Sequence, residues 1–237
     1  MAENFGGSAL IKKEFKKQEA GQLLKKIVQR LIGEGKQVAF KEACLMVKKM
    51  DRLAVLIYVV HEGEKRLSSV GHTLIQKFFY LLHEAKNFPL GYKFRLYYYG
   101  PYCAELWGDL NTLAELGYLN IQAKSNGFGY EINVTVDGKE LINSHHDFLA
   151  NARDKIEDLL TILEGEPVRR LEDLATAFYV FNDWKKKGIQ SGDGEVIASL
   201  QNLKPHLKEE EIKAALQVLR GRLPFVRFYI PAHRPGG

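Results

Sequence analysis

The spacing of hydrophobic residues changes abruptly at Gly100-Pro101, near the middle of the 237-residue chain. Before this point, hydrophobic and polar positions alternate over residues 92–99, which is the period of a β-strand with two different faces. One face would carry Phe94, Leu96 and Tyr98, and the other would carry Lys93, Arg95, Tyr97 and Tyr99. The pattern predicts an aromatic strand that ends at the Gly-Pro turn.

A helical pattern begins directly after the turn. Residues 102–117 carry leucines three or four positions apart, a spacing that predicts one buried stripe: Leu106, Leu110, Leu113 and Leu116. Pro101 suits the first turn of this helix because its missing N–H would have no partner there, and Gly117 suits the C-terminal end. Two strands should follow, residues 118–123 and 130–136, joined by a turn at Asn126-Gly127. A strand, a helix and a hairpin in this order are typical of a winged helix-turn-helix domain.

Further helical patterns lie on both sides of this core: residues 22–31, 40–49, 53–61, 71–84, 139–163, 168–187, 192–200 and 209–219. The first should stop at Gly33-Glu34-Gly35, and Asp51 should cap the helix 53–61. Residues 1–50 are either a genuine helical pair or a loosely structured upstream extension.

The predicted fold is mainly α with a small β wing (α+β). It has four parts: a basic N-terminal arm with helices (1–50), a winged-helix domain (51–138), a linking helix with a C-terminal helical domain (139–220), and a loosely ordered tail (221–237).

Composition favours a soluble, cytoplasmic protein. Hydrophobic residues make up 46% of the chain, enough for a sizeable core, and the two cysteines do not form a disulfide framework. The N-terminal residues do not resemble a secretory signal, and the longest apolar run, residues 53–60, is too short to span a membrane.

The positive charge is concentrated near the N-terminus. The net charge is +5, and residues 1–50 hold 11 Lys and Arg residues against 5 Asp and Glu residues. Cations on a mobile arm and a wing can bind DNA phosphates. The candidate DNA-binding residues are Lys12, Lys13, Lys16 and Lys17 in the arm, Lys93 and Arg95 on the strand, and Lys124 and Asn126 at the wing. The same basic run can instead be a solvated helical face, since Glu14, Glu19 and Glu34 interrupt it.

The helix 102–117 would be the recognition helix of a DNA-binding winged helix, yet it contains no Lys or Arg. Its outward residues are expected to include Glu105, Asp109, Asn111, Thr112 and Glu115. Carboxylates facing a phosphate-lined groove are repelled. Insertion of this helix into the major groove is therefore unfavourable, and any DNA contact should lie at the wing and the arm.

Two hypotheses for function follow. The first is a DNA-associated transcriptional regulator with the C-terminal helices forming a homodimer. The second is a protein-interaction or antitoxin-like module that binds a partner through the acidic helix and aromatic turn, with Tyr99, Tyr102, Glu105, Trp107 and Asp109 as candidate contacts. Alternatively, the aromatic residues of the strand simply pack beneath the wing and fix the Gly-Pro turn, which is the interpretation favoured by the pattern.

Catalytic and metal sites have little support in the sequence. His145-His146 with Asp147 lacks further ligands at suitable spacing, and adjacent helical residues point about 100° apart. Cys103 at a helix start is expected to be a buried structural cysteine, although a reactive thiol is the alternative. Phosphate-binding, dinucleotide-binding and hydrolase motifs are absent from the sequence. We expect a non-catalytic protein without a cofactor.

The same segments resemble the YwgA-like family of bacterial and archaeal winged-helix proteins. The resemblance rests on the helix at residues 74–82, on a turn matching Tyr92, Phe94, Tyr97 and Tyr99-Gly100-Pro101-Tyr102, and on a helix matching Glu105-Leu106, Asp109-Leu110, Leu113, Gly117 and Leu119. Residues 171–176 and 203–212 extend it, so it covers about residues 51–219. Cys103 departs from the family's serine. More loosely, the turn is similar to that of Panacea-type domains found in antitoxins. The resemblance implies a winged-helix regulator or a defence-associated protein, without an activity.

Overall fold

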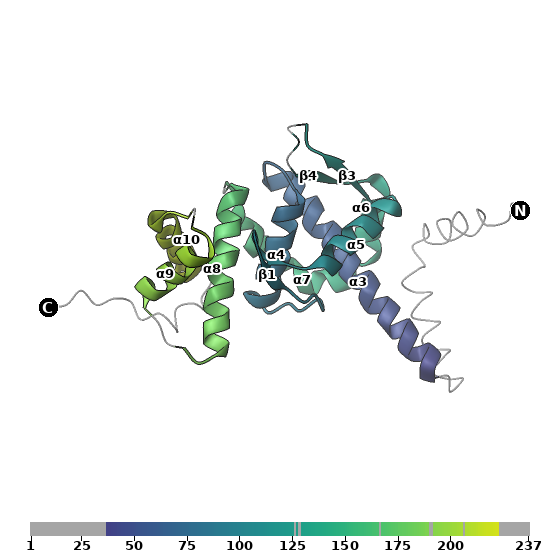
Figure 1. The fold of residues 1–237 in the computed structure, drawn as a ribbon. Helices are drawn as coiled ribbons and strands as arrows, with labels where there is room; N and C mark the ends of the chain where they lie inside the picture. Colours follow the sequence, from purple (N-terminus) through teal and green to yellow (C-terminus); the bar gives the residue numbers. More distant parts are fainter. Residues whose placement is uncertain are drawn as a thin grey trace, which may run out of the picture. The chain divides into compact units, whose positions relative to one another are not determined.

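The computed structural model describes residues 37–125, 127, 129–165, 167–189, 192–205 and 207–222. The described chain is mainly helical, with two small antiparallel strand pairs (Figure 1). Its helices are α3 (Gln37–Arg66), α4 (His72–Glu84), α5 (Ala104–Glu115), α6 (Val136–Ser144), α7 (His146–Leu163), α8 (Val168–Lys186), α9 (Asp193–Leu203) and α10 (Glu209–Arg222). Its strands are β1 (Arg95–Tyr97), β2 (Gly100–Tyr102), β3 (Leu119–Ala123) and β4 (Tyr130–Val134).

Two compact units are distinguished by their internal contacts. Among the described residues, one unit contains the segment up to Val70 together with Gly108–Ile156, and the other contains Gly71–Trp107 together with the residues from Glu157 onward. One boundary between the units falls between α3 and α4, and the other two fall inside α5 and α7. These units cut across the winged-helix range 51–138, which stays a prediction.

In the first unit, α3 contacts α6 and β4. The central run of α3, residues 53–60, is buried on all sides. The strands β3 and β4 pair from Leu119↔Val134 to Ala123↔Tyr130, as the hairpin pattern predicts. Their base is fixed by two long-range hydrogen bonds: the Ile132 N–H donates to the Val70 carbonyl (2.8 Å), and the Val134 N–H donates to Glu64 Oε1 (2.8 Å).

The helix α6 begins beside this hairpin. The Thr135 side chain accepts from the Gly138 N–H and donates to the Gly117 carbonyl oxygen (2.7 Å), so one hydroxyl caps α6 and ties it to the end of α5. Glycine is required at position 138, because an added Cβ would lie 2.3 Å from the Tyr118 carbonyl oxygen.

The predicted end of α5 is confirmed. Gly117 has φ +80°, the Tyr118 N–H donates to the Leu113 carbonyl, and the Gly117 N–H donates to the Ala114 carbonyl. This is the Schellman arrangement that glycine permits. Leu106, Leu110 and Leu113 are buried as predicted, whereas Leu116 is exposed, which corrects the predicted stripe.

In the second unit, α4 contacts β2 and α8, and α8 contacts α9 and α10. The predicted helices 71–84, 168–187, 192–200 and 209–219 are confirmed, with ends shifted by up to three residues. Aromatic rings fill the core around α4: Tyr80 contacts Phe94 and Phe178, and Phe79 contacts Tyr92.

Three predicted boundaries are wrong. The helices 40–49 and 53–61 are parts of one helix, α3, because no glycine or proline lies between Gln37 and Glu62 and the sequence offers nothing to end a helix there. Asp51 therefore lies inside α3 and does not cap a helix.

The predicted helix 139–163 is instead two helices, α6 and α7, separated at His145. This residue has φ −112° and ψ 23°, outside the helical region. The Ser144 hydroxyl and His145 Nδ1 lie 2.8 Å and 3.1 Å from the Leu141 carbonyl oxygen. These side chains thus replace the backbone N–H that would bond this carbonyl if the helix continued.

The third correction concerns the aromatic strand. Its paired part is only Arg95–Tyr97, and Pro101 lies in β2, opposite Leu96, rather than in the first turn of α5. Gly100, with φ +87°, reverses the chain early enough for β2 to pair with β1 before the helix begins at Ala104.

Candidate functional site

Two buried polar side chains of α4 form hydrogen bonds with the backbone of the hairpin β1–β2 and of the residue that follows it. The Lys77 Nζ donates to the Pro101 carbonyl oxygen (2.9 Å). The Gln76 side-chain amide bonds both backbone groups of Cys103: its Nε2 donates to the carbonyl oxygen (2.9 Å), and its Oε1 accepts from the N–H (2.8 Å). The short hairpin therefore has a fixed base despite having only three residue pairs.

Gly100, at the turn end of the hairpin, lies close to α8. A Cβ on Gly100 would lie 2.5 Å from Thr176 Oγ1, and Thr176 donates to the Glu172 carbonyl oxygen (2.7 Å). Only a residue without a side chain fits both this close approach and the positive φ.

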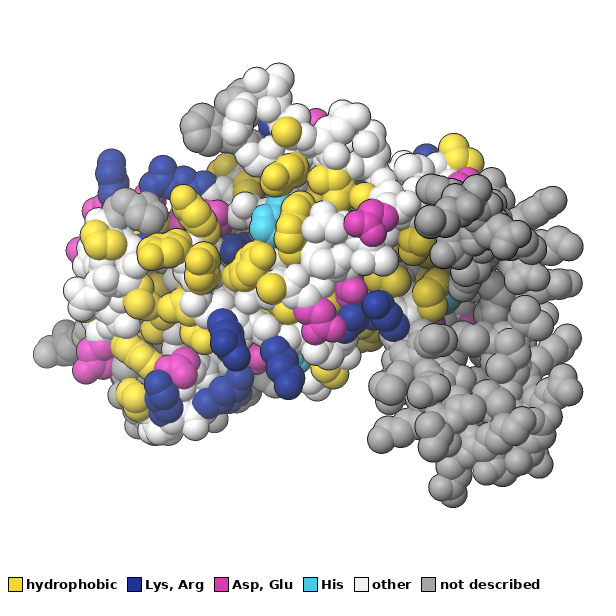
Figure 2. Space-filling model, turned by 45° about the vertical axis from the view of Figure 1, so that its right-hand side comes forward, with side chains coloured by type: hydrophobic (Ala, Val, Ile, Leu, Met, Phe, Trp, Pro, Cys, Tyr) yellow, Lys and Arg dark blue, Asp and Glu magenta, His cyan; other side chains and the backbone are white. Residues whose placement is uncertain are grey.

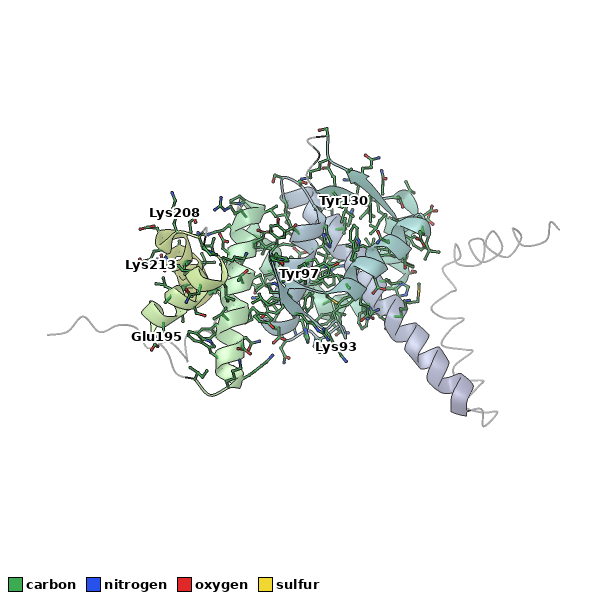
Figure 3. The ribbon with its side chains drawn as sticks, in the orientation of Figure 1. Lys93, Tyr97, Tyr130, Glu195, Lys208 and Lys213 are labelled. Carbon is green, nitrogen blue, oxygen red and sulfur yellow. The ribbon has the colours of Figure 1, made fainter. Side chains whose placement is uncertain are left out.

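Three consecutive tyrosines project from the turn end of the hairpin. Tyr97, Tyr98 and Tyr99 have exposed fractions of 63%, 81% and 69%. Tyr98 and Tyr99 form the two-residue turn, since Tyr97 pairs with Gly100. Figure 3 labels Tyr97 at this hairpin and Lys93 on the segment that leads into it. The prediction that these aromatic residues pack beneath the wing is wrong, because an alternating aromatic pattern does not show which face is covered.

A second aromatic group lies next to the hairpin, where α4 begins. The His72 ring lies 4.3 Å from the Trp107 ring and 5.8 Å from the Tyr102 ring, between centroids. Burial, with a smaller contribution from the positive charge of Lys77, lowers the pKa of His72 to about 4. His72 is therefore neutral at physiological pH and packs as an aromatic residue.

Acid should destabilise the protein through His72. Its pKa of about 4 lies below the ordinary 6.5, so the unfolded chain takes up this proton first. This group's contribution to stability is complete above about pH 6.5 and is lost as the pH falls toward about 4. Urea unfolding at pH 7 and pH 4.5 should show that His72→Phe, which keeps a ring there, loses less stability than the wild type, by about 1–2 kcal/mol. Equal losses would show that His72 does not cause the acid sensitivity.

A pocket of about 380 Å³ lies beside the hairpin. It is lined by Leu96, Tyr97 and Tyr98 of the hairpin, Thr176 of α8, and Leu203 and Lys204 at the end of α9. Burial lowers the pKa of Lys77 to about 8, against the opposing effect of Glu172, and burial also lowers the pKa of Lys204. The base of the hairpin and the pocket thus contain two desolvated ammonium groups.

The candidate DNA-binding residues are only partly described. Lys93 and Arg95 are exposed, and Lys124 is half-buried in the other unit. Asn126, Lys12, Lys13, Lys16 and Lys17 lie outside the described residues.

The candidate partner-binding residues divide into two groups. Tyr99 and Glu105 are exposed, and Tyr102 and Trp107 are half-buried. Asp109, predicted to face outward, is instead 4% exposed and forms an ion pair with Arg52 (2.8 Å). The pairing explains why a carboxylate is tolerated on the buried side of α5.

Sequence reasoning missed Gln76, Lys77, Thr176 and Lys204. The only available signal was that Gln76 and Lys77 interrupt an apolar helix whose hydrophobic residues cover more than one face. Cys103 is buried, as expected of a structural cysteine.

Comparison with known proteins gives no assignment: no family model matches the chain, and no curated protein matches it. The resemblance to the YwgA-like family therefore stays a prediction. Within the described part of the chain, no helix has the length and apolar character needed to cross a membrane. Among those residues, no three His, Cys, Asp or Glu side chains are grouped as metal ligands would be.

Proposed function

We propose that this protein is a protein-interaction module whose tyrosine turn, Tyr97-Tyr98-Tyr99, contacts a protein partner. The observation that carries the proposal is the exposure of all three rings on a hairpin whose base is fixed. Tyrosine is enriched at protein interfaces because its ring supplies a large contact area with few rotatable bonds and its hydroxyl can hydrogen-bond. A fixed hairpin lowers the conformational entropy lost on binding.

The surroundings of the turn are consistent with this role. Exposed Lys93 and Arg95 precede the tyrosines on the same segment, and Figure 2 shows that hydrophobic and basic side chains lie near one another on one face of the molecule. Exposed aromatic residues rimmed by polar groups are typical of interaction sites. The proposed contact residues are Tyr97, Tyr98 and Tyr99, with Tyr102, whose ring lies 5.9 Å from that of Tyr97, and the exposed Glu105. Asp109 is excluded by its burial against Arg52.

A DNA-associated winged-helix regulator is the second candidate. It is supported by exposed Lys93 and Arg95 close to the turn. The exposed residues of α5 oppose it, since Glu105 and Glu115 would face a phosphate backbone. Any DNA contact would then use the hairpin cations rather than α5.

Site-specific photo-crosslinking in the cells that make the protein tests both functions. A photoreactive phenylalanine analogue at position 98 should give a discrete protein adduct, because Tyr98 is the most exposed of the three rings. The matched control places the analogue at Val136, which is 73% exposed in the other unit and should give no such adduct.

The identity of the adduct decides between the two candidates. Tyr97→Ser with Tyr99→Ser should reduce the protein adduct about tenfold. An adduct to DNA that Lys93→Ala with Arg95→Ala removes would support the regulator instead. Equal labelling from positions 98 and 136, or none from either, would contradict a role for the turn. An adduct to a second copy of the chain would identify the partner as the protein itself.

A further inference from the structure

The pocket beside the hairpin combines apolar walls with one buried cation. Leu96 and Leu203 supply aliphatic surface, and Tyr97 and Tyr98 supply aromatic surface. All of its lining residues belong to the second unit. Its volume of about 380 Å³ lies within the range of about 300–1,000 Å³ that small-molecule sites occupy.

Lys204 is the cation of this pocket. It follows the last turn of α9, where its N–H donates to the Leu200 carbonyl (2.8 Å) and its own carbonyl accepts from the Leu207 N–H (3.0 Å). These two hydrogen bonds fix the backbone of Lys204 on both sides, and the residue is only 4% exposed. Burying an ammonium group is unfavourable unless negative charge compensates it.

The compensation within the protein is incomplete. Glu172 and Asp173 attract the Lys204 ammonium, but burial outweighs their effect and leaves the pKa of Lys204 lowered. Glu172 also acts on Lys77, so one carboxylate is shared between two buried lysines. Arg169 adds a further positive charge to the surroundings of Lys204. An incoming anion would stabilise this arrangement more than a neutral molecule would.

We propose that this pocket binds a small organic carboxylate with an aromatic or branched apolar body. The carboxylate would lie against Lys204, and the body would contact Leu203, Leu96 and the ring of Tyr98. An ammonium–carboxylate hydrogen bond in a partly desolvated site is stronger than a neutral one, and the apolar walls favour the body by removing it from water. This site goes beyond the proposed partner contact and does not depend on it.

A pair of probes that differ only in charge tests the site. 3-Phenylpropionate and its neutral amide, 3-phenylpropionamide, have nearly the same size, and ligand NMR titration of the full chain gives the dissociation constant of each. We expect the carboxylate to bind at least about tenfold more tightly than the amide. Equal affinities, or no saturable binding up to about 10 mM, would overturn the proposal.

Three variants locate the binding. Lys204→Met should weaken the carboxylate at least about tenfold and change the amide little, whereas Lys208→Met, at an exposed lysine nearby, should change neither. Leu203→Glu is the second line of evidence if Lys204→Met does not fold. Leu203 is 47% exposed, so we expect the variant to fold, and a carboxylate at the pocket should weaken binding of the anionic probe about tenfold.

Two results would contradict the assignment to a small acid held by Lys204. The first is a loss of carboxylate binding in Lys208→Met as large as in Lys204→Met. The second is tighter binding of a tetrapeptide ending in phenylalanine carboxylate than of the free acid, which would identify a chain terminus as the occupant.

Discussion

Replacing Asp109 with alanine should lower the free energy of unfolding by about 3–5 kcal/mol. Asp109 and Arg52 lie 2.8 Å apart with side chains only 6% and 13% exposed. Removing the carboxylate takes this counter-charge away from a partly buried guanidinium, and losing one partner of such a pair costs more than the pair itself contributes. Chemical denaturation followed by circular dichroism gives the change directly.

Two further variants show whether the pairing is the cause. Glu115→Ala removes an exposed carboxylate from the same helix and should change stability by less than about 0.5 kcal/mol. Replacing both partners, Arg52→Met with Asp109→Leu, should recover a substantial part of the loss, since neither charge is then buried alone. A loss in Asp109→Ala no larger than in Glu115→Ala would show that the ion pair is not important for folding.

The second large effect is expected at Gly100. Gly100→Ala should cost about 2–4 kcal/mol, because alanine at φ +87° is strained and its Cβ would overlap Thr176 Oγ1. The matched control is Gly194→Ala in α9, where the added Cβ meets nothing within 4 Å and the backbone is helical. That change should stabilise the protein slightly, by up to about 1 kcal/mol.

A double-mutant cycle separates the two causes at Gly100. In Thr176→Ala the clashing hydroxyl is absent, so adding Gly100→Ala should cost about 1–2 kcal/mol less than it does in the wild type. The remainder measures the backbone strain. Purely additive effects would mean that the close approach to Thr176 contributes nothing.

The helices of this fold could be predicted because each carries a hydrophobic stripe with a clear period. The errors arose where local signals competed. Asp51 is a good capping residue, but the helix-forming residues on both sides of it make one continuous helix more favourable. His145 lies in an apparently unbroken helical pattern, yet side-chain bonds to the Leu141 carbonyl end α6 there.

The candidate site was harder to predict than the fold. The alternating aromatic pattern predicted a strand of which only Arg95–Tyr97 is paired, and its period cannot show that the rings of Tyr97, Tyr98 and Tyr99 are exposed. The partners of Gln76 and Lys77 are backbone groups 27 and 24 residues away. Every residue has a backbone carbonyl, so the sequence cannot show which one these side chains bind. Lys204 follows α9 with no pattern that distinguishes it from the exposed Lys208.

The division of each unit into two separated segments determines when folding can finish during synthesis. The hairpin and α4 leave the ribosome well before α8, so Lys77 and Gly100 must wait for Thr176 and Glu172 to complete their surroundings. Contacts that span such distances along the chain slow folding. Until α8 emerges, the surface of α4 that contacts it stays uncovered, and a fragment that stops at residue 138 would keep that surface exposed.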